Sequence, residues 1–264
     1  ASQPYTVTSP HSARQDEYHW LRDDDPKTKR HEIVRYLEAE NAYTHRMLQP
    51  LERLRAGLVG EMRARMRADD AGPPQYDDGF WYWLHFDRGA EYPRLMRRAG
   101  TTERPAPKAR DEVVLDQPAL ARGKPFFNLG AAAVSPSRQL VAWTEDTQGR
   151  RIHTLRFRDL ASGRTLPDEI PGVLEAVVWS ADSRSVFYIL QDPVTLQSGA
   201  VKRHRLGTPA SEDATVYDEA DKTLLTEIRL SASRRQLVIH IEGYATTETL
   251  AVPTDRPEQA PRVV

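Results

Sequence analysis

The chain of 264 residues contains no cysteine, which excludes disulfides, thiolate nucleophiles and cysteine-ligated zinc. Its 37 basic and 38 acidic residues give a formal net charge of −1, so there is no bulk attraction to nucleic acid or to an anionic membrane. No apolar run approaches the roughly 18–20 residues that span a bilayer. We therefore expect no nucleic-acid or membrane partner and a cytoplasmic location. A periplasmic location stays open because the chain does not begin with Met.

Glycine is scarce, and its spacing excludes three common motifs. No two of the 14 glycines are four apart, as a Gly-x-Ser-x-Gly nucleophile turn requires. None are five apart before a lysine, as in a phosphate loop, or two apart, as in a dinucleotide fingerprint. His31-Glu32 is followed by Arg35 where the zinc-peptidase helix signature needs histidine. We therefore expect no cofactor, no metal and no complete catalytic centre in this chain.

What the sequence does contain is a repeated plan. A small serine-containing turn precedes an apolar strand three times, at Ser135, Ser180 and Ser231. These serines are 45 and 51 residues apart (180 − 135 and 231 − 180), close to the repeat of about 40–50 residues of four-stranded propeller blades. Each triplet separates two apolar strands, where a small polar turn is required. We interpret the serines as hairpin turns and not as nucleophiles.

The periodicity of the apolar residues changes at Gly72-Pro73-Pro74. Before it, two helices are predicted, at about 29–49 and 51–66, after an irregular start over residues 1–26. After it, short alternating and aromatic runs indicate strands. The sequence therefore predicts a mainly β protein, with an N-terminal extended and helical segment at 1–72 and a partial β-propeller at 73–264. The blades are predicted at about 75–116, 125–170, 175–219 and 223–253.

Two further patterns have competing interpretations. The arginines between Arg53 and Arg67 could form a nucleic-acid face, but Glu52 and Glu61 dilute them, and a solvated face or an interdomain contact is favoured. The aromatic run at 80–86 could stack bases, but a strand whose rings fill space between blades is favoured.

Several short motifs resemble the prolyl oligopeptidase family. Residues 16–23, Asp-Glu-Tyr-His-Trp-Leu-Arg-Asp, and 36–44, Tyr-Leu-Glu-Ala-Glu-Asn-Ala-Tyr-Thr, are similar to its N-terminal motifs. Within that family, three segments look like oligopeptidase B, and 202–208 is similar to the pattern of the third blade. The three segments are residues 91–93, 146–151 and 154–160. The resemblance runs from about residue 4 to residue 253.

The resemblance implies a seven-bladed propeller, of which about four blades are present here, capping an α/β-hydrolase domain. It implies a serine peptidase that hydrolyses short peptides after Lys or Arg, with its catalytic Ser, Asp and His in the C-terminal domain. The N-terminal helices are expected to pack against that domain. We expect this chain, a fragment or a truncated gene product, to gate substrate and dock the catalytic domain, and to be inactive alone.

Asp146, Arg150 and Arg151 are the candidate site residues, because their hairpin could make charged contacts across the domain boundary. An exposed turn with ordinary surface charges is the alternative, since surface ion pairs contribute only about 0–1 kcal/mol. The sequence leaves two other functions open. One is a stand-alone degenerate propeller that binds a peptide or a protein, and the other is a complete hydrolase with unusual machinery.

Overall fold

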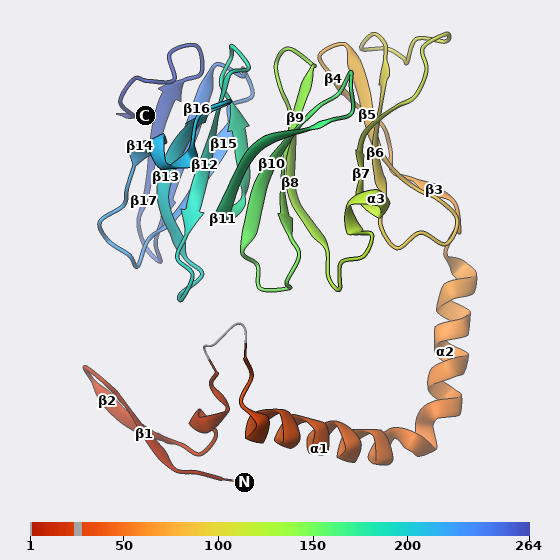
Figure 1. Cartoon of the computed structure of the whole chain (residues 1–264), viewed down its shortest axis with the longest axis vertical. Helices are drawn as coiled ribbons and strands as arrows, with labels where there is room; N and C mark the ends of the chain where they lie inside the picture. The colour runs from red at the N-terminus through yellow and green to blue at the C-terminus, as the bar shows by residue number, and fades with distance from the viewer. Residues whose placement is uncertain (1, 24–27) are drawn as a thin grey trace. The chain divides into compact units, whose positions relative to one another are not determined.

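A computed structural model describes residues 2–23 and 28–264. The chain divides into two compact units, residues 1–67 and 68–264, close to the Gly72-Pro73-Pro74 break. Strands dominate the second unit and helices the first (Figure 1). The predicted fold class, a mainly β partial propeller preceded by a helical segment, is confirmed.

The helical unit starts with a hairpin, so the prediction of an irregular start is wrong for residues 5–16. Strands β1 (Tyr5–Ser9) and β2 (Ser12–Asp16) pair in antiparallel register. The Ser9 hydroxyl closes the turn by donating to the Ser12 carbonyl at 3.0 Å. The 3₁₀ turn η1 (His19–Leu21), helix α1 (His31–Leu48), the turn η2 (Gln49–Leu51) and helix α2 (Glu52–Arg65) follow.

Pro50 falls in the first turn of η2, where a missing backbone N–H is tolerated, so the helical path changes register there. Ile33 is the one buried residue among the described part of this unit. No helix among the described residues is long and apolar enough to cross a lipid bilayer.

The propeller unit consists of successive antiparallel sheets. Blade 1 contains β3 (Asp70–Ala71), β4 (Gln75–Asp77), β5 (Phe80–Phe86), β6 (Arg94–Ala99) and β7 (Glu112–Asp116). Blade 2 follows the short helix α3 (Gln117–Ala121) and contains β8 (Asn128–Val134), β9 (Leu140–Asp146), β10 (His153–Asp159) and the start of β11 (Thr165–Trp179).

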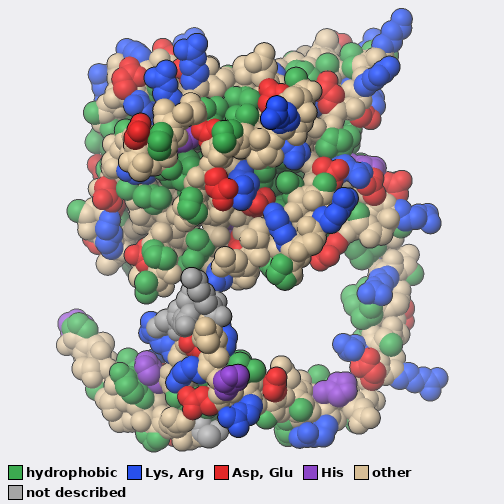
Figure 2. All heavy atoms as spheres, viewed as in Figure 1, with side chains coloured by type: hydrophobic (Ala, Val, Ile, Leu, Met, Phe, Trp, Pro, Cys, Tyr) green, Lys and Arg blue, Asp and Glu red, His purple; other side chains and the backbone are tan. Residues whose placement is uncertain are grey.

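Blade 3 takes the end of β11 together with β12 (Ser185–Gln191), β13 (Ser198–Arg205) and β14 (Ala214–Tyr217), with the 3₁₀ turn η3 (Ala210–Glu212) before β14. Blade 4 contains β15 (Leu225–Leu230), β16 (Gln236–Glu242), β17 (Thr247–Pro253) and β18 (Arg262–Val263). Figure 2 shows charged side chains of both signs interspersed with hydrophobic ones over the visible face of these sheets.

Strand β11 belongs to two blades. Its first half pairs with β10 between Thr165 and Val173, and its second half pairs with β12 between Val173 and Trp179, so Val173 has a partner in both strands. Gly172 lies at this junction at φ +73°, a conformation that L side chains rarely adopt. Blades 2 and 3 are therefore one seven-stranded sheet in hydrogen-bonding terms, whereas blades 1 and 4 have sheets of their own.

The three serine triplets form equivalent hairpin turns, which confirms their structural interpretation. In each turn the serine N–H donates at 2.9 Å to the carbonyl five residues later. Each serine hydroxyl then accepts the N–H of that same later residue, at 3.0–3.1 Å. The fourth residue of each turn has a left-handed backbone, and these residues are Arg138, Ser183 and Arg234.

The core lies between successive blades. One cluster joins Leu115 of blade 1 to Trp143 of blade 2, and a second joins Phe157 of blade 2 to Tyr188 of blade 3. The third and largest joins blades 3 and 4 around Leu237. Each blade thus buries its apolar residues against its neighbour, as the predicted repeat requires.

Candidate functional site

The candidate loop at residues 146–151 is organised by Asp146. This residue ends β9 and is 2% exposed. One carboxylate oxygen accepts the backbone N–H groups of Gln148 at 2.8 Å and Gly149 at 3.0 Å, and the other accepts that of Arg151 at 2.8 Å. A carboxylate that caps its own loop in this way fixes the loop's conformation. Among the described residues, Asp146 therefore shapes the site and makes no charged contact.

The two arginines of the loop present their charges outward. Arg150 is half-buried and Arg151 is exposed, with a left-handed backbone at φ +60°. Within the part of the chain that the structure describes, neither guanidinium has a hydrogen-bonding or ion-pair partner. The structure thus brings the three predicted residues together as one ordered loop with two cationic side chains available.

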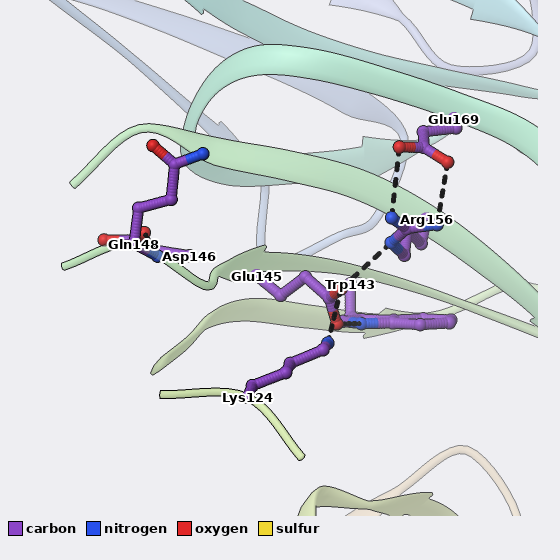
Figure 3. Close-up of polar contacts among 7 residues, drawn as sticks. All are labelled: Lys124, Trp143, Glu145, Asp146, Gln148, Arg156 and Glu169. Atoms are coloured by element: carbon purple, nitrogen blue, oxygen red, sulfur yellow. Dashed lines mark hydrogen bonds and ion pairs between the residues drawn. The ribbon is translucent and has the colours of Figure 1, made fainter. Parts of the chain in front are cut away.

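A buried carboxylate, Glu145, precedes this loop in the sequence and is at the centre of a polar cluster (Figure 3). Glu145 is 4% exposed and accepts three hydrogen bonds, each at 3.0 Å. The donors are Lys124 Nζ, Trp143 Nε1 and Arg156 Nε. Arg156 also donates two hydrogen bonds to Glu169 on β11, from Nη1 to Oε2 at 2.9 Å and from Nη2 to Oε1 at 3.0 Å. Two acids and two bases therefore form a neutral cluster, which offsets the cost of removing Glu145 from water.

Sequence reasoning found the loop and missed this cluster. Its members come from the segment before β8 and from β9, β10 and β11, and they meet only through strand register, in which Arg156 stands opposite Trp143. The one local signal is the spacing of Trp143 and Glu145 two apart on a strand, which places both on one face. Lys124 and Glu169 carry no signal of their participation.

A second buried polar cluster links blades 2 and 3. His204 on β13 is 1% exposed and has a carboxylate at each ring nitrogen. Nδ1 lies 2.8 Å from Asp213 and Nε2 lies 3.1 Å from Asp168, which is on β11. The Tyr188 hydroxyl donates to Asp213 at 2.8 Å, and burial together with this hydrogen bond raises the pKa of Tyr188. The position of this cluster inside the sheet gives it a structural role.

A cavity of about 870 Å³ lies along the inner strands of blades 2, 3 and 4. Strands β8, β11 and β15 form its walls, and its size falls in the range of ligand pockets. No group of three or more His, Cys, Asp or Glu able to hold a metal ion occurs among the described residues. The expectation that the chain has no cofactor stays a prediction.

These features define a β-propeller whose blades pack through shared cores. Residues 2–264 match the family described as prolyl oligopeptidase, N-terminal beta-propeller domain, and the chain belongs to this family. It is 40% identical over 97% of its length to dipeptidyl aminopeptidase BI of Pseudoxanthomonas mexicana. Among solved structures, it resembles oligopeptidase B from Leishmania major, with a TM-score of 0.90 at 25% identity over the whole chain.

The chain is shorter than these relatives. It covers 37% of the Pseudoxanthomonas mexicana protein and 39% of the Leishmania major chain. A second solved relative, oligopeptidase B from Trypanosoma brucei with covalently bound antipain in a closed form, is matched over 38% of its length with a TM-score of 0.85 and 24% identity, a likeness of fold. The sequence thus corresponds to the N-terminal propeller portion of peptidases, and the predicted family and keywords are confirmed.

Proposed function

We propose that this chain is the propeller portion of a serine oligopeptidase that hydrolyses short peptides after Lys or Arg. Its partner is a C-terminal α/β-hydrolase domain that carries the catalytic residues. The observation that carries this proposal is the match of residues 2–264 to the N-terminal propeller of the prolyl oligopeptidase family. The preference for Lys and Arg rests on the resemblance of residues 91–93, 146–151 and 154–160 to oligopeptidase B.

The loop at 146–151 is the contact that we propose for docking the catalytic domain. Its backbone is fixed by Asp146, so the arginines are presented without the entropic cost of ordering a flexible loop. The neutral cluster around Glu145 leaves their positive charge uncompensated. Such a loop fits an acidic patch on the partner.

The chain also gates substrates in this proposal. Each blade buries its core against the next, and the cavity along their inner strands has the size for a peptide segment but not for a folded protein. Selection of substrates by size then follows from the dimensions of the cavity and requires no conformational change in this chain.

A chimera tests the proposal directly. This chain replaces the matched N-terminal portion of the Pseudoxanthomonas mexicana relative, and the purified chimera is assayed with short reporter peptides carrying Arg, Lys, Pro or Leu before the cleaved bond. Because the chimera carries the catalytic domain of the relative, we expect it to keep that relative's own preference among the short reporters and not to cleave a folded protein that contains the same sequence. A folded chimera that is inactive, or that cleaves the folded protein as fast as the reporters, contradicts the proposal.

The docking loop is tested in the same chimera. Replacing Arg150 and Arg151 by Glu reverses the charge of the loop, and we expect kcat/KM to fall about tenfold, the effect of losing about 1.4 kcal/mol of contact energy. The matched control is Arg164→Glu, an exposed arginine of the β10–β11 turn. Equal effects of the loop variant and the control contradict docking through this loop and leave the family function intact.

A further inference from the structure

The cavity described above is apolar along its walls and charged at its ends. Its walls include Ala133 on β8, Val177 on β11 and Ile228 on β15, the inner strands of three successive blades. Both β8 and β15 are edge strands of their sheets. Edge strands present unpaired N–H and C=O groups, to which an extended peptide can add.

The charges that line the cavity are unevenly distributed. Five arginines face three acidic residues, although the chain as a whole has a formal net charge of −1. The arginines are on or next to the serine turns and the end of β17, and they are Arg138, Arg229, Arg234, Arg235 and Arg256. Glu175 lines the cavity four residues before the end of β11, roughly 13 Å along the strand from the turn. The cavity therefore has an arginine end and an acidic residue towards its other end.

The arginine end already binds carboxylates of the chain itself. Arg138 pairs with Asp78 in the turn between β4 and β5, and Arg234 pairs with Asp77 at the end of β4. These pairs show that the guanidinium groups at this end are placed where a carboxylate can reach them.

Donors remain at this end after those two pairs are formed. Arg138 Nη1 is buried and has no hydrogen-bonding partner among the described residues. Arg229 and Arg235 are exposed, and the described part of the chain supplies no ion-pair partner for either. A buried unsatisfied guanidinium nitrogen beside two further arginines costs free energy that an anionic ligand would recover.

We propose that the arginine end of this cavity binds the C-terminal carboxylate of a short peptide, with the peptide chain lying along the apolar walls. Guanidinium groups bind carboxylates through two parallel hydrogen bonds, which sets the direction of the peptide as well as its affinity. This inference rests on the proposed function and narrows it, because it makes a free C-terminus part of what the propeller selects. Arg229 and Arg235 are then specificity-determining residues.

The test is isothermal titration of the 264-residue chain with the pentapeptide Ala-Val-Leu-Ala-Leu, as its free acid and as its C-terminal amide. We expect the free acid to bind about tenfold more tightly than the amide, the gain of one charge-assisted pair. In the double variant Arg229→Gln/Arg235→Gln this ratio should fall to about one. The control double variant Arg110→Gln/Arg164→Gln, at exposed arginines outside the cavity, should keep it.

A third peptide, the amide with its last Leu replaced by Glu, separates the sources of the carboxylate. Weaker binding than the free acid supports recognition of the C-terminus, and equal binding overturns it in favour of any carboxylate. Equal affinity of acid and amide, a ratio that survives Arg229→Gln/Arg235→Gln, or no binding of either peptide also overturns the proposal. The far-UV circular dichroism of each variant must match that of the parent. The titration needs no cleavage, so its outcome is independent of the chimera assay.

Discussion

In the helical unit, Leu54 on α2 is 60% exposed, whereas in the propeller unit Leu237 on β16 is fully buried. The same difference in burial separates the helices of the first unit from the strands of the second. Most of the large apolar side chains from α1 to the residue after α2 lie open to solvent, and these are Leu37, Tyr43, Met47, Leu48, Leu51, Leu54, Leu58, Met62 and Met66. The apolar faces of β9, β12 and β16 are covered by the neighbouring blade. The apolar residues of a blade are therefore covered by the next repeat of the same chain. An apolar stripe on a helix indicates that another surface must cover it but does not identify that surface.

Truncation of an apolar side chain should show the largest contrast between the two units. Phe157→Ala, in the core between blades 2 and 3, should lower the free energy of unfolding by about 3–5 kcal/mol. Leu54→Ala should change it by less than about 0.5 kcal/mol. Urea titration followed by tryptophan fluorescence measures both. Comparable losses would contradict the contrast in burial.

The buried histidine gives the next largest effect. His204→Gln leaves the carboxylate of Asp168 or Asp213, or both, without the hydrogen bond to the imidazole ring. We therefore expect the free energy of unfolding to fall by about 3 kcal/mol. His45→Gln, at an exposed position of α1, serves as the control and should lie within about 0.5 kcal/mol of the parent. If thermal unfolding shows the two variants to be equally stable, the His204 cluster does not hold blades 2 and 3 together.

Replacing a glycine by alanine should lower the free energy of unfolding in the propeller unit and raise it in the helical unit. A Cβ at Gly100 would lie 2.6 Å from the Arg104 carbonyl oxygen and from Pro105 Cα, so Gly100→Ala should cost about 1–3 kcal/mol. A Cβ at Gly60 on α2 meets nothing within 4 Å, so Gly60→Ala should stabilise that helix by about 0.5–1 kcal/mol. Ellipticity at 222 nm during thermal unfolding reports both. The same sign for both variants would be inconsistent with the structure.

The smallest expected effect is on the stability of the propeller unit at acid pH. Backbone N–H groups of Thr195 and Val194 hold the pKa of Asp192 below its ordinary value of 3.8. A depressed pKa contributes stability that is present above the unfolded value and is lost as the pH falls through the folded value, here below about pH 4. Asp192→Asn should therefore reduce the acid sensitivity of the propeller's fluorescence transition below about pH 4.

The helical unit supplies the matching control for this acid effect. Glu52→Gln removes a carboxylate on α2 whose pKa is lowered by its hydrogen bond to Arg55. It should leave the fluorescence transition of the propeller unit unchanged. An unchanged acid profile in Asp192→Asn would show that the capped loop contributes nothing to acid stability.

The sequence predicted the features that repeat or that depend on local chemistry. The serine turns were predicted because two apolar strands joined by a small polar segment form a hairpin, and this pattern repeats at blade spacing. The loop at 146–151 was found through its resemblance to oligopeptidase B. The hairpin at 5–16, α3 and β18 were missed because each is short and has too few apolar residues for a periodicity.

The structure places Asp146, Arg150 and Arg151 in one loop, and their role as interdomain contacts stays a prediction. Asp146 was expected to offer a charge outward, but its carboxylate is fully engaged by the backbone of its own loop. The Glu145 cluster depends on strand register across four segments, which no local pattern specifies. The arginine end of the cavity likewise arises only when turns of different blades are brought to one side.

The continuity of β11 has a mechanical consequence. Blades 2 and 3 share strand β11, so separating them requires breaking the backbone hydrogen bonds that β11 makes with β10 or with β12. Blades 3 and 4 are joined covalently only by the segment 218–224, and blades 1 and 2 by α3 and the residues around it. We therefore expect a force that separates the blades to act first between blades 1 and 2 or between blades 3 and 4, while blades 2 and 3 stay together.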